Sequence, residues 1–221
     1  MDRRHFSKTV VGGAAGLAMS RGLARTSERT SAARASFGVS VMLWTVFRDL
    51  PFEQRLERVA EAGYRNVELV GENEKWSDED FRRVTPKRKE LGIKFDAMTG
   101  VKHGIANPSE QDAAVADLRG ALPMMERLEC PAIIVLSGNV VPSVSREAQH
   151  RSCVEALKRM AALIEGKKVN GEPVRVLLEC IDPEENSKYF LTSAAEALEI
   201  VKEVDHPQVQ FLYDLYHEQI A

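Results

Sequence analysis

The chain has 221 residues, of which 44% are hydrophobic and 29% are charged, and its formal net charge is −3. This is the composition of a globular protein and excludes a disordered, collagen-like or coiled-coil chain. The charge is uneven: residues 1–35 contain seven Lys/Arg and two Asp/Glu, whereas residues 36–221 contain 23 basic and 31 acidic residues. The excess of acidic residues in residues 36–221 argues against nucleic-acid binding, because the phosphates of nucleic acids are bound by Lys and Arg. No apolar run reaches the ~20 residues of a membrane-spanning helix, so we expect no stable membrane insertion.

The basic segment at residues 1–35 has the parts of an export signal. Arg3 and Arg4 are followed by Phe6 and Lys8, and an uncharged stretch rich in Ala, Gly and Val comes next. This order resembles a twin-arginine signal, by which bacteria export folded proteins. We therefore expect residues 1–35 to be a leader, the twin-arginine export machinery to be a partner, and the protein to be periplasmic. The alternative is a basic tail on a cytoplasmic protein.

Residues 36–221 are expected to form one domain in which strands and helices alternate. The strands are predicted from apolar runs at residues 37–47, 66–70, 94–99, 132–136, 174–179 and 209–214. The helices are predicted from apolar residues at helical spacing, at residues 52–62, 78–91, 109–125, 145–165 and 193–204. Pro123 is expected to bend or split the third helix. Six strands alternating with five helices predict an α/β fold with a parallel sheet.

Two parallel architectures are compatible with this alternation. A doubly wound sheet usually has a glycine-rich, phosphate-binding turn after its first strand, but residues 48–51 are Arg-Asp-Leu-Pro and contain no glycine. In a (β/α)8 TIM barrel the functional residues lie at the C-terminal ends of several strands, and polar residues do occur there in this sequence. We therefore predict a TIM barrel, with about six of its eight βα units present in residues 36–221.

Carboxylates lie at or near the ends of the predicted strands. Glu179 ends the fifth strand, Asp214 ends the sixth, and Glu68 lies within the second. Burying a carboxylate is costly unless it is paired or binds a cation. Two carboxylates on adjacent strands at equal depth would repel each other, raise a pKa or recruit a metal ion. The alternative is that each carboxylate caps the next helix or pairs with a Lys or Arg of a loop.

Two histidines in predicted loops are candidates for substrate binding. His217 lies three residues after Asp214, so the chain must turn out of the strand to bring its imidazole over the mouth of the barrel. His103 follows Lys102 in the loop after the third strand. A histidine in such a loop can orient a substrate hydroxyl or relay a proton near neutral pH. The alternative for His217 is a surface histidine beside Glu218.

These segments resemble the hydroxypyruvate isomerase branch of the xylose isomerase-like barrels. The similar stretches are Val-Leu-Leu-Glu at 176–179, Phe-Leu-Tyr-Asp-Leu-Tyr-His-Glu-Gln at 211–219 and Glu-Ala-Gly-Tyr-Arg-Asn-Val-Glu-Leu at 61–69. The resemblance implies that Glu179 and Asp214 bind a divalent metal ion and that His217 touches the substrate. It also implies that Glu179 is one of two catalytic glutamates. Glu68 and His103 complete our candidates for substrate binding.

The activity that the resemblance implies is an isomerisation through an enediolate. Mg²⁺ or Mn²⁺ on carboxylate oxygens polarises a carbonyl, and a glutamate moves a proton between the neighbouring carbons. The substrate would be a small hydroxy-carbonyl compound of the hydroxypyruvate/tartronate semialdehyde type, or a sugar. The alternatives are a sugar epimerase of the same superfamily, a non-catalytic sugar-binding barrel and a metal-dependent phosphodiesterase like the apurinic-site endonucleases. The sequence leaves a homo-oligomer open.

The sequence departs from this family at its C-terminal end. The family has a third metal ligand, His or Gln, on the seventh strand and a fourth, Glu, on the eighth, and neither has a counterpart before Ala221. We therefore expect the sequence to be a C-terminally truncated form of a longer protein. We also expect the 221-residue chain by itself to be inactive.

Overall fold

Six parallel strands form the main sheet of the computed structural model, which describes residues 38–220. Each strand pairs in parallel with the next one, in chain order and without a reversal. A doubly wound sheet reverses its strand order at one point, so this order favours a barrel. The predicted parallel α/β class is confirmed. The strands are β1 (Ser40–Met42), β2 (Asn66–Leu69), β3 (Lys94–Thr99), β4 (Ala132–Leu136), β7 (Arg175–Glu179) and β8 (Val209–Leu212).

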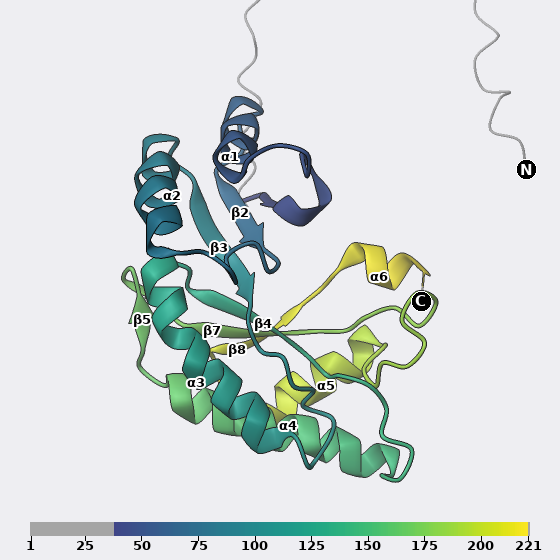
Figure 1. Cartoon of the computed structure of the whole chain (residues 1–221). Helices are drawn as coiled ribbons and strands as arrows, with labels where there is room; N and C mark the ends of the chain where they lie inside the picture. Colours follow the sequence, from purple (N-terminus) through teal and green to yellow (C-terminus); the bar gives the residue numbers. More distant parts are fainter. Residues whose placement is uncertain (1–37, 221) are drawn as a thin grey trace, which may run out of the picture. The chain divides into compact units, whose positions relative to one another are not determined.

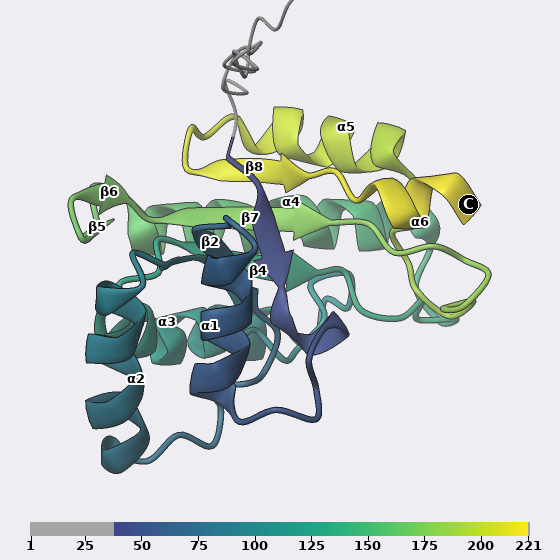
Figure 2. The same cartoon turned by 90° about the horizontal axis from the view of Figure 1, so that it is seen from above.

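Helices connect the successive strands and cover one face of the sheet. Figure 1 shows α3 and α4 side by side along β4 and β7, and Figure 2 shows α5 running beside β8. The short helix α6 follows β8 directly. The helices are α1 (Phe52–Glu61), α2 (Asp78–Glu90), α3 (Gln111–Leu128), α4 (Arg146–Ile164), α5 (Ala194–Val204) and α6 (Leu215–Ile220).

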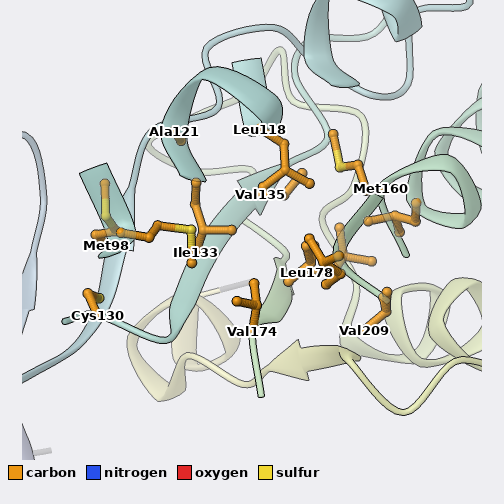
Figure 3. Close-up of a cluster of buried hydrophobic side chains, with 14 of the residues drawn as sticks. Met98, Leu118, Ala121, Cys130, Ile133, Val135, Met160, Val174, Leu178 and Val209 are labelled. Carbon is orange, nitrogen blue, oxygen red and sulfur yellow. The ribbon is translucent and has the colours of Figure 1, made fainter. Parts of the chain in front are cut away.

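The main hydrophobic core lies between the sheet and these helices (Figure 3). Ile133 and Val135 of β4 and Leu178 of β7 are fully buried there, together with Leu118 of α3 and Met160 of α4. Side chains alternate between the two faces of a strand, so every second residue of β4 and β7 points toward the helices. The residues between them point to the opposite, inner face.

The inner face of the sheet has a smaller apolar cluster and also carries polar groups. Its apolar side chains are Ala97, Ala132, Ile134, Leu136, Leu177 and Leu212. Beside them lies an open hollow of about 310 Å³, whose lining includes Glu68, Asp96 and Arg175. The alternation therefore separates a dry, helix-facing core from an inner face that carries ionisable groups.

The first strand is much shorter than predicted. Only Ser40–Met42 pair as a strand, and a 3-10 turn, η1 (Leu43–Thr45), follows. Phe47 has a φ of 52° and so cannot continue a strand. The buried carbonyl of Leu43 accepts a hydrogen bond from Arg55 of α1 and not from a neighbouring strand. The prediction of a strand over residues 37–47 was therefore wrong beyond Met42.

Four further details of the prediction differ from the structure, one being that no helix was predicted at residues 215–220, where α6 lies. Helix α3 continues through Pro123 without a break. Proline has no N–H to donate to the carbonyl of Arg119, four residues earlier, but both residues are exposed, so water can bind this carbonyl instead. Strand β8 ends at Leu212, and Asp214 lies in the turn that follows it. A small antiparallel hairpin, β5 (Lys168–Val169) with β6 (Glu172–Pro173), was missed because each of its strands has only two residues.

The predicted leader, residues 1–35, lies outside the residues that the structure describes. Between residues 38 and 220, no helix combines the length and the apolar character needed to cross a membrane.

Two loops at the C-terminal side of the sheet meet through glycines. A Cβ atom on Gly138, in the loop after β4, would lie 2.6 Å from the Cα atom of Gly104, in the loop after β3. Gly138 also has a φ of +77°, which side chains of L-residues rarely tolerate. The contact allows Ala106 to donate its N–H to the carbonyl of Ser137 at 2.9 Å. The two loops thus form one support beside the ends of β3 and β4.

We expect Gly138→Ala to lower the free energy of unfolding by about 2–3 kcal/mol, because it adds both a backbone clash and an unfavourable φ. The matched control is Gly120→Ala. Gly120 lies inside α3, and a Cβ there would have no atom within 4 Å. Alanine should stabilise that position by about 0.5–1 kcal/mol. Urea unfolding of the three proteins measures both effects, and equal stability of Gly138→Ala and the parent would contradict the close loop contact.

Candidate functional site

Glu179 and Asp214 meet at the C-terminal ends of the last two strands. Glu179 is the final residue of β7 and pairs in register with Leu212, the final residue of β8. Asp214 follows Leu212 by two residues, so its carboxylate returns to the same side as that of Glu179. One ligand atom each of Glu179, Asp214 and His217 lies within 4.8 Å of the other two. The structure therefore brings together three of the residues that the sequence singles out.

The turn into α6 explains how His217 reaches this position. Asp214 Oδ1 accepts the N–H of Tyr216 at 2.7 Å, and the Asp214 carbonyl accepts the N–H of Glu218 at 3.1 Å. These bonds start the helix directly after Asp214, and residues three apart lie on the same side of a helix. His217 Nε2 consequently lies 3.7 Å from Asp214 Oδ2 and 4.0 Å from Glu179 Oε1. One oxygen of Asp214 thus caps α6, as our alternative proposed, while the other faces the histidine.

Helix α6 is also tied to the loop between β7 and α5. The hydroxyl of Tyr216 donates to Glu185 Oε1 at 2.6 Å. Glu218 Oε1 accepts the N–H of Ala194, the first residue of α5, at 3.1 Å. Both α6 and the loop therefore have side chains that hold them against each other. This attachment fixes the orientation of the His217 ring between them.

Asp182, in the same loop, is a functional candidate that the sequence analysis missed. Its side chain is completely buried, and Asp182 Oδ2 lies 2.7 Å from His217 Nδ1. The hydrogen bond from the N–H of Glu185, followed by that from His217, holds the pKa of Asp182 below its usual value. The sequence did contain a signal for Asp182, because it is a second carboxylate three residues after Glu179, which ends β7.

The acidic groups of the cluster repel one another. Burial raises the pKa of Glu179 to about 8, and repulsion from Asp214 and then Glu68 adds to this effect. A carboxylate in such surroundings binds either a proton or a cation. Two carboxylates and an imidazole within a few ångströms form an oxygen-rich donor set that suits Mg²⁺ or Mn²⁺. Glu179 and Asp214 therefore fit a divalent metal ion, with His217 beside them.

Glu68 extends the cluster along the inner face. Burial raises its pKa to about 7, and repulsion from Asp96, Asp214 and Glu72 contributes as well. Asp96 of β3 was missed by the sequence analysis because it lies in mid-strand; burial raises its pKa, although the hydroxyl of Ser40 donates to it at 2.7 Å. Glu68 thus lies near Glu179 and Asp214, and Asp96 lies near Glu68 on the same inner face.

His103 has a separate partner. Its Nδ1 atom lies 2.8 Å from Oδ2 of Asp117 on α3, and the same oxygen accepts the backbone N–H groups of Lys102 and His103. Its side chain is 47% exposed. Between residues 38 and 220, no hydrogen bond joins His103 to Glu68, Glu179 or Asp214. The structure thus places His103 with α3 and not in the acidic cluster.

Residues 56–221 match the family model described as xylose isomerase-like TIM barrel. The chain belongs to this family. The match covers most of the chain and confirms the predicted barrel fold and family. It also accounts for the strand order, since barrel strands follow one another in sequence.

The curated relatives are isomerases. The chain is 26% identical to the 2-oxo-tetronate isomerase of Pectobacterium atrosepticum, over 80% of this chain and 67% of that protein. It is 24% identical to the hydroxypyruvate isomerase of Escherichia coli, over 81% of this chain and 69% of that protein. The chain therefore spans about two thirds of the length of these relatives. At this level of identity, the relatives support an isomerase and leave the substrate of this protein open.

Two solved structures show the same fold. A family 2 AP endonuclease from Brucella melitensis superposes with a TM-score of 0.68 at 23% identity, covering 83% of this chain and 69% of that one. D-psicose 3-epimerase from Clostridium cellulolyticum H10, solved with D-tagatose, superposes with a TM-score of 0.61 at 20% identity. The second match covers 77% of this chain and 60% of the epimerase. Identities this low show the fold alone.

We expect Glu68→Gln to stabilise the metal-free protein at alkaline pH. The pKa of Glu68 is about 7 in the folded state against an ordinary value of 4.5, so the parent loses stability as the pH rises through this interval. The variant has no such charge to repel its neighbours. It should therefore be more stable by about 1–3 kcal/mol at pH 8 and show no advantage at pH 4.

Thermal or urea unfolding in the presence of a chelator measures this difference. The control is Glu199→Gln, an exposed position on α5, which should change stability by less than about 0.5 kcal/mol at either pH. A Glu68→Gln variant less stable than the parent at pH 8 would show that the carboxylate makes a favourable interaction in the fold.

Proposed function

We propose that the protein is a metal-assisted isomerase of a small hydroxy-carbonyl compound of the hydroxypyruvate/tartronate semialdehyde type. The observation that carries this proposal is the group formed by Glu179, Asp214 and His217, whose ligand atoms lie within 4.8 Å of one another. The group lies at the C-terminal side of the sheet, where TIM barrels have their active sites. The names of the curated relatives, which are isomerases of hydroxypyruvate and 2-oxo-tetronate, support the same reaction class.

Glu179 and Asp214 would hold the metal ion, Mg²⁺ or Mn²⁺, with His217 beside it. When bound, the ion supplies Lewis acidity to a substrate carbonyl. The side chain of Glu179 is 12% exposed and that of Asp214 is 22% exposed. Both carboxylates are therefore mostly buried, but each keeps some contact with solvent. A small substrate can approach them from the solvent side.

Glu179 is the residue that we assign to proton transfer. It takes the proton from the hydroxyl-bearing carbon next to the carbonyl, which leaves an enediolate, and it delivers a proton to the former carbonyl carbon. His217 orients a substrate hydroxyl through Nε2, and Glu68 contacts the substrate from the inner face of the sheet. The reaction consumes no co-reactant, because one proton leaves one carbon and one joins the other, while the hydroxyl proton of the first carbon passes to the former carbonyl oxygen. The proton held by Glu179 between the two steps can exchange with solvent.

The test is proton exchange at the carbon next to the carbonyl of hydroxypyruvate, followed by NMR in D₂O with Mn²⁺ or Mg²⁺. The full-length gene product should exchange this proton, and Glu179→Gln should lower the rate by about 10²–10⁴-fold because the transferring carboxylate is absent. Glu179→Gln should also weaken Mn²⁺ binding in isothermal titration. The control Glu199→Gln should leave both measurements unchanged.

Other outcomes of this test point to the alternatives. Exchange on a ketose but not on hydroxypyruvate would indicate a sugar epimerase that uses the same residues. Sugar binding that survives Glu179→Gln, without any exchange, would indicate a non-catalytic barrel. Absence of exchange with every hydroxy-carbonyl compound and sugar tested would refute the proposed reaction.

We also propose that residues 1–35 direct export through the twin-arginine machinery. Fused to a folded fluorescent reporter in a bacterial host, they should carry it to the periplasm. The double substitution Arg3→Lys/Arg4→Lys should retain it in the cytoplasm, because this machinery recognises the arginine pair and not the positive charge alone. The matched control is Arg21→Lys/Arg25→Lys, which should export normally. A parent fusion that stays in the cytoplasm would favour the cytoplasmic alternative.

A further inference from the structure

Asp182 is a buried charge that the proposed reaction does not use. Its side chain has no exposed surface, and it lies in the loop after β7, three residues beyond Glu179. A buried carboxylate is costly unless its oxygens accept hydrogen bonds. The partners of these oxygens therefore indicate what Asp182 does.

Each oxygen of Asp182 has a different partner. Oδ1 accepts the backbone N–H of Glu185 at 2.7 Å, which closes a tight turn in the loop. Oδ2 lies 2.7 Å from Nδ1 of His217 on α6. An ionised carboxylate can only accept hydrogen bonds, so Nδ1 of His217 is the donor and carries a proton.

The proton on Nδ1 determines the state of the other ring nitrogen. In a neutral imidazole only one nitrogen carries hydrogen, and the other has a free lone pair. Nε2 of His217 is the nitrogen that faces the site, at 3.7 Å from Asp214 Oδ2 and 4.0 Å from Glu179 Oε1. When the ring is neutral, Nε2 therefore presents an acceptor, and not a donor, toward the space in front of the two carboxylates.

We propose that Asp182 is a positioning residue that holds His217 in the tautomer protonated on Nδ1, so that Nε2 accepts a hydrogen bond from a hydroxyl group of the substrate. The role of the substrate hydroxyl rests on the proposed function, whereas the tautomer does not. The opposite tautomer would donate from Nε2 toward Asp214 and Glu179. It would then compete with the substrate for these carboxylates.

The two hydrogen-bond donors, Glu185 N–H and His217 Nδ1, also explain why position 182 needs a carboxylate. An asparagine has nearly the same shape but only one acceptor oxygen, with an NH₂ group in place of the second. If that oxygen keeps the bond from Glu185, the NH₂ group must face Nδ1 of His217. The ring can then accept this bond only by moving its proton to Nε2. Asp182→Asn should therefore reverse the tautomer of His217 with little change in volume.

The test is the ¹⁵N spectrum of the histidine side chains in the metal-free protein at about pH 8.5, where an ordinary imidazole is neutral. The His217 signals are assigned by their loss in His217→Gln. In the parent protein, His217 should carry its proton on Nδ1 and show a pyridine-type nitrogen at Nε2. In Asp182→Asn these two assignments should exchange.

A second aspartate provides a matched control. Asp117 Oδ2 lies 2.8 Å from Nδ1 of His103, a distance close to that of the Asp182–His217 pair, and this pair lies away from the acidic cluster. Asp117→Asn should alter the signals of His103 and leave those of His217 unchanged. A parent protein whose His217 is protonated on Nε2, or on both nitrogens, overturns the proposal without any need for a folded variant.

Kinetics then separates positioning from simple structural support. In the full-length protein, Asp182→Asn should lower kcat/KM for proton exchange by about 10–100-fold, the usual effect of losing a partner that orients a ligand side chain. A reversed tautomer with unchanged kcat/KM overturns the role toward the substrate. A parent protein with the expected tautomer but no exchange on any substrate refutes the proposed isomerase reaction and leaves the positioning of His217 by Asp182 intact.

Discussion

Repulsion among buried carboxylates is the constraint on which the site depends. Glu179 and Glu68 lie on different strands of the sheet, and burial together with neighbouring acids raises the pKa of both. Within residues 38–220, no arginine or lysine forms an ion pair with Glu68 or Glu179. Apolar residues in place of Glu179 and Glu68 would make the fold more stable. The arrangement therefore makes physical sense for a site that binds a cation and a polar substrate.

The two faces of the sheet keep this repulsion away from the core. Residues of β7 alternate between the helix-facing core, which contains Val176 and Leu178, and the inner face, which contains Leu177 and Glu179. Because the helices supply the apolar contacts on one side, the other side is free to carry charge. Helix α6 then completes the site: it begins directly after Asp214, which caps it, and presents His217 to Glu179.

Much of the fold could be predicted from local patterns. Four strands and five helices were predicted close to their observed bounds, because buried parallel strands are short apolar runs and the helices have clear apolar stripes. The first strand was overestimated, since apolar composition does not reveal that Arg55 binds the carbonyl of Leu43 or that Phe47 has a positive φ. The β5–β6 hairpin was missed because two-residue strands have no periodicity.

The sequence by itself determined the α/β class and the family resemblance. It also determined the candidates Glu179, Asp214 and His217, because a carboxylate at the end of an apolar run can be recognised without knowing the fold. Only the tertiary structure decided that Asp182 lies beside His217, that Asp96 lies near Glu68 and that His103 pairs with Asp117. These facts depend on which loops and strands lie side by side. Such neighbours are far apart along the chain, up to 35 residues for Asp182 and His217, and no local pattern encodes their contact.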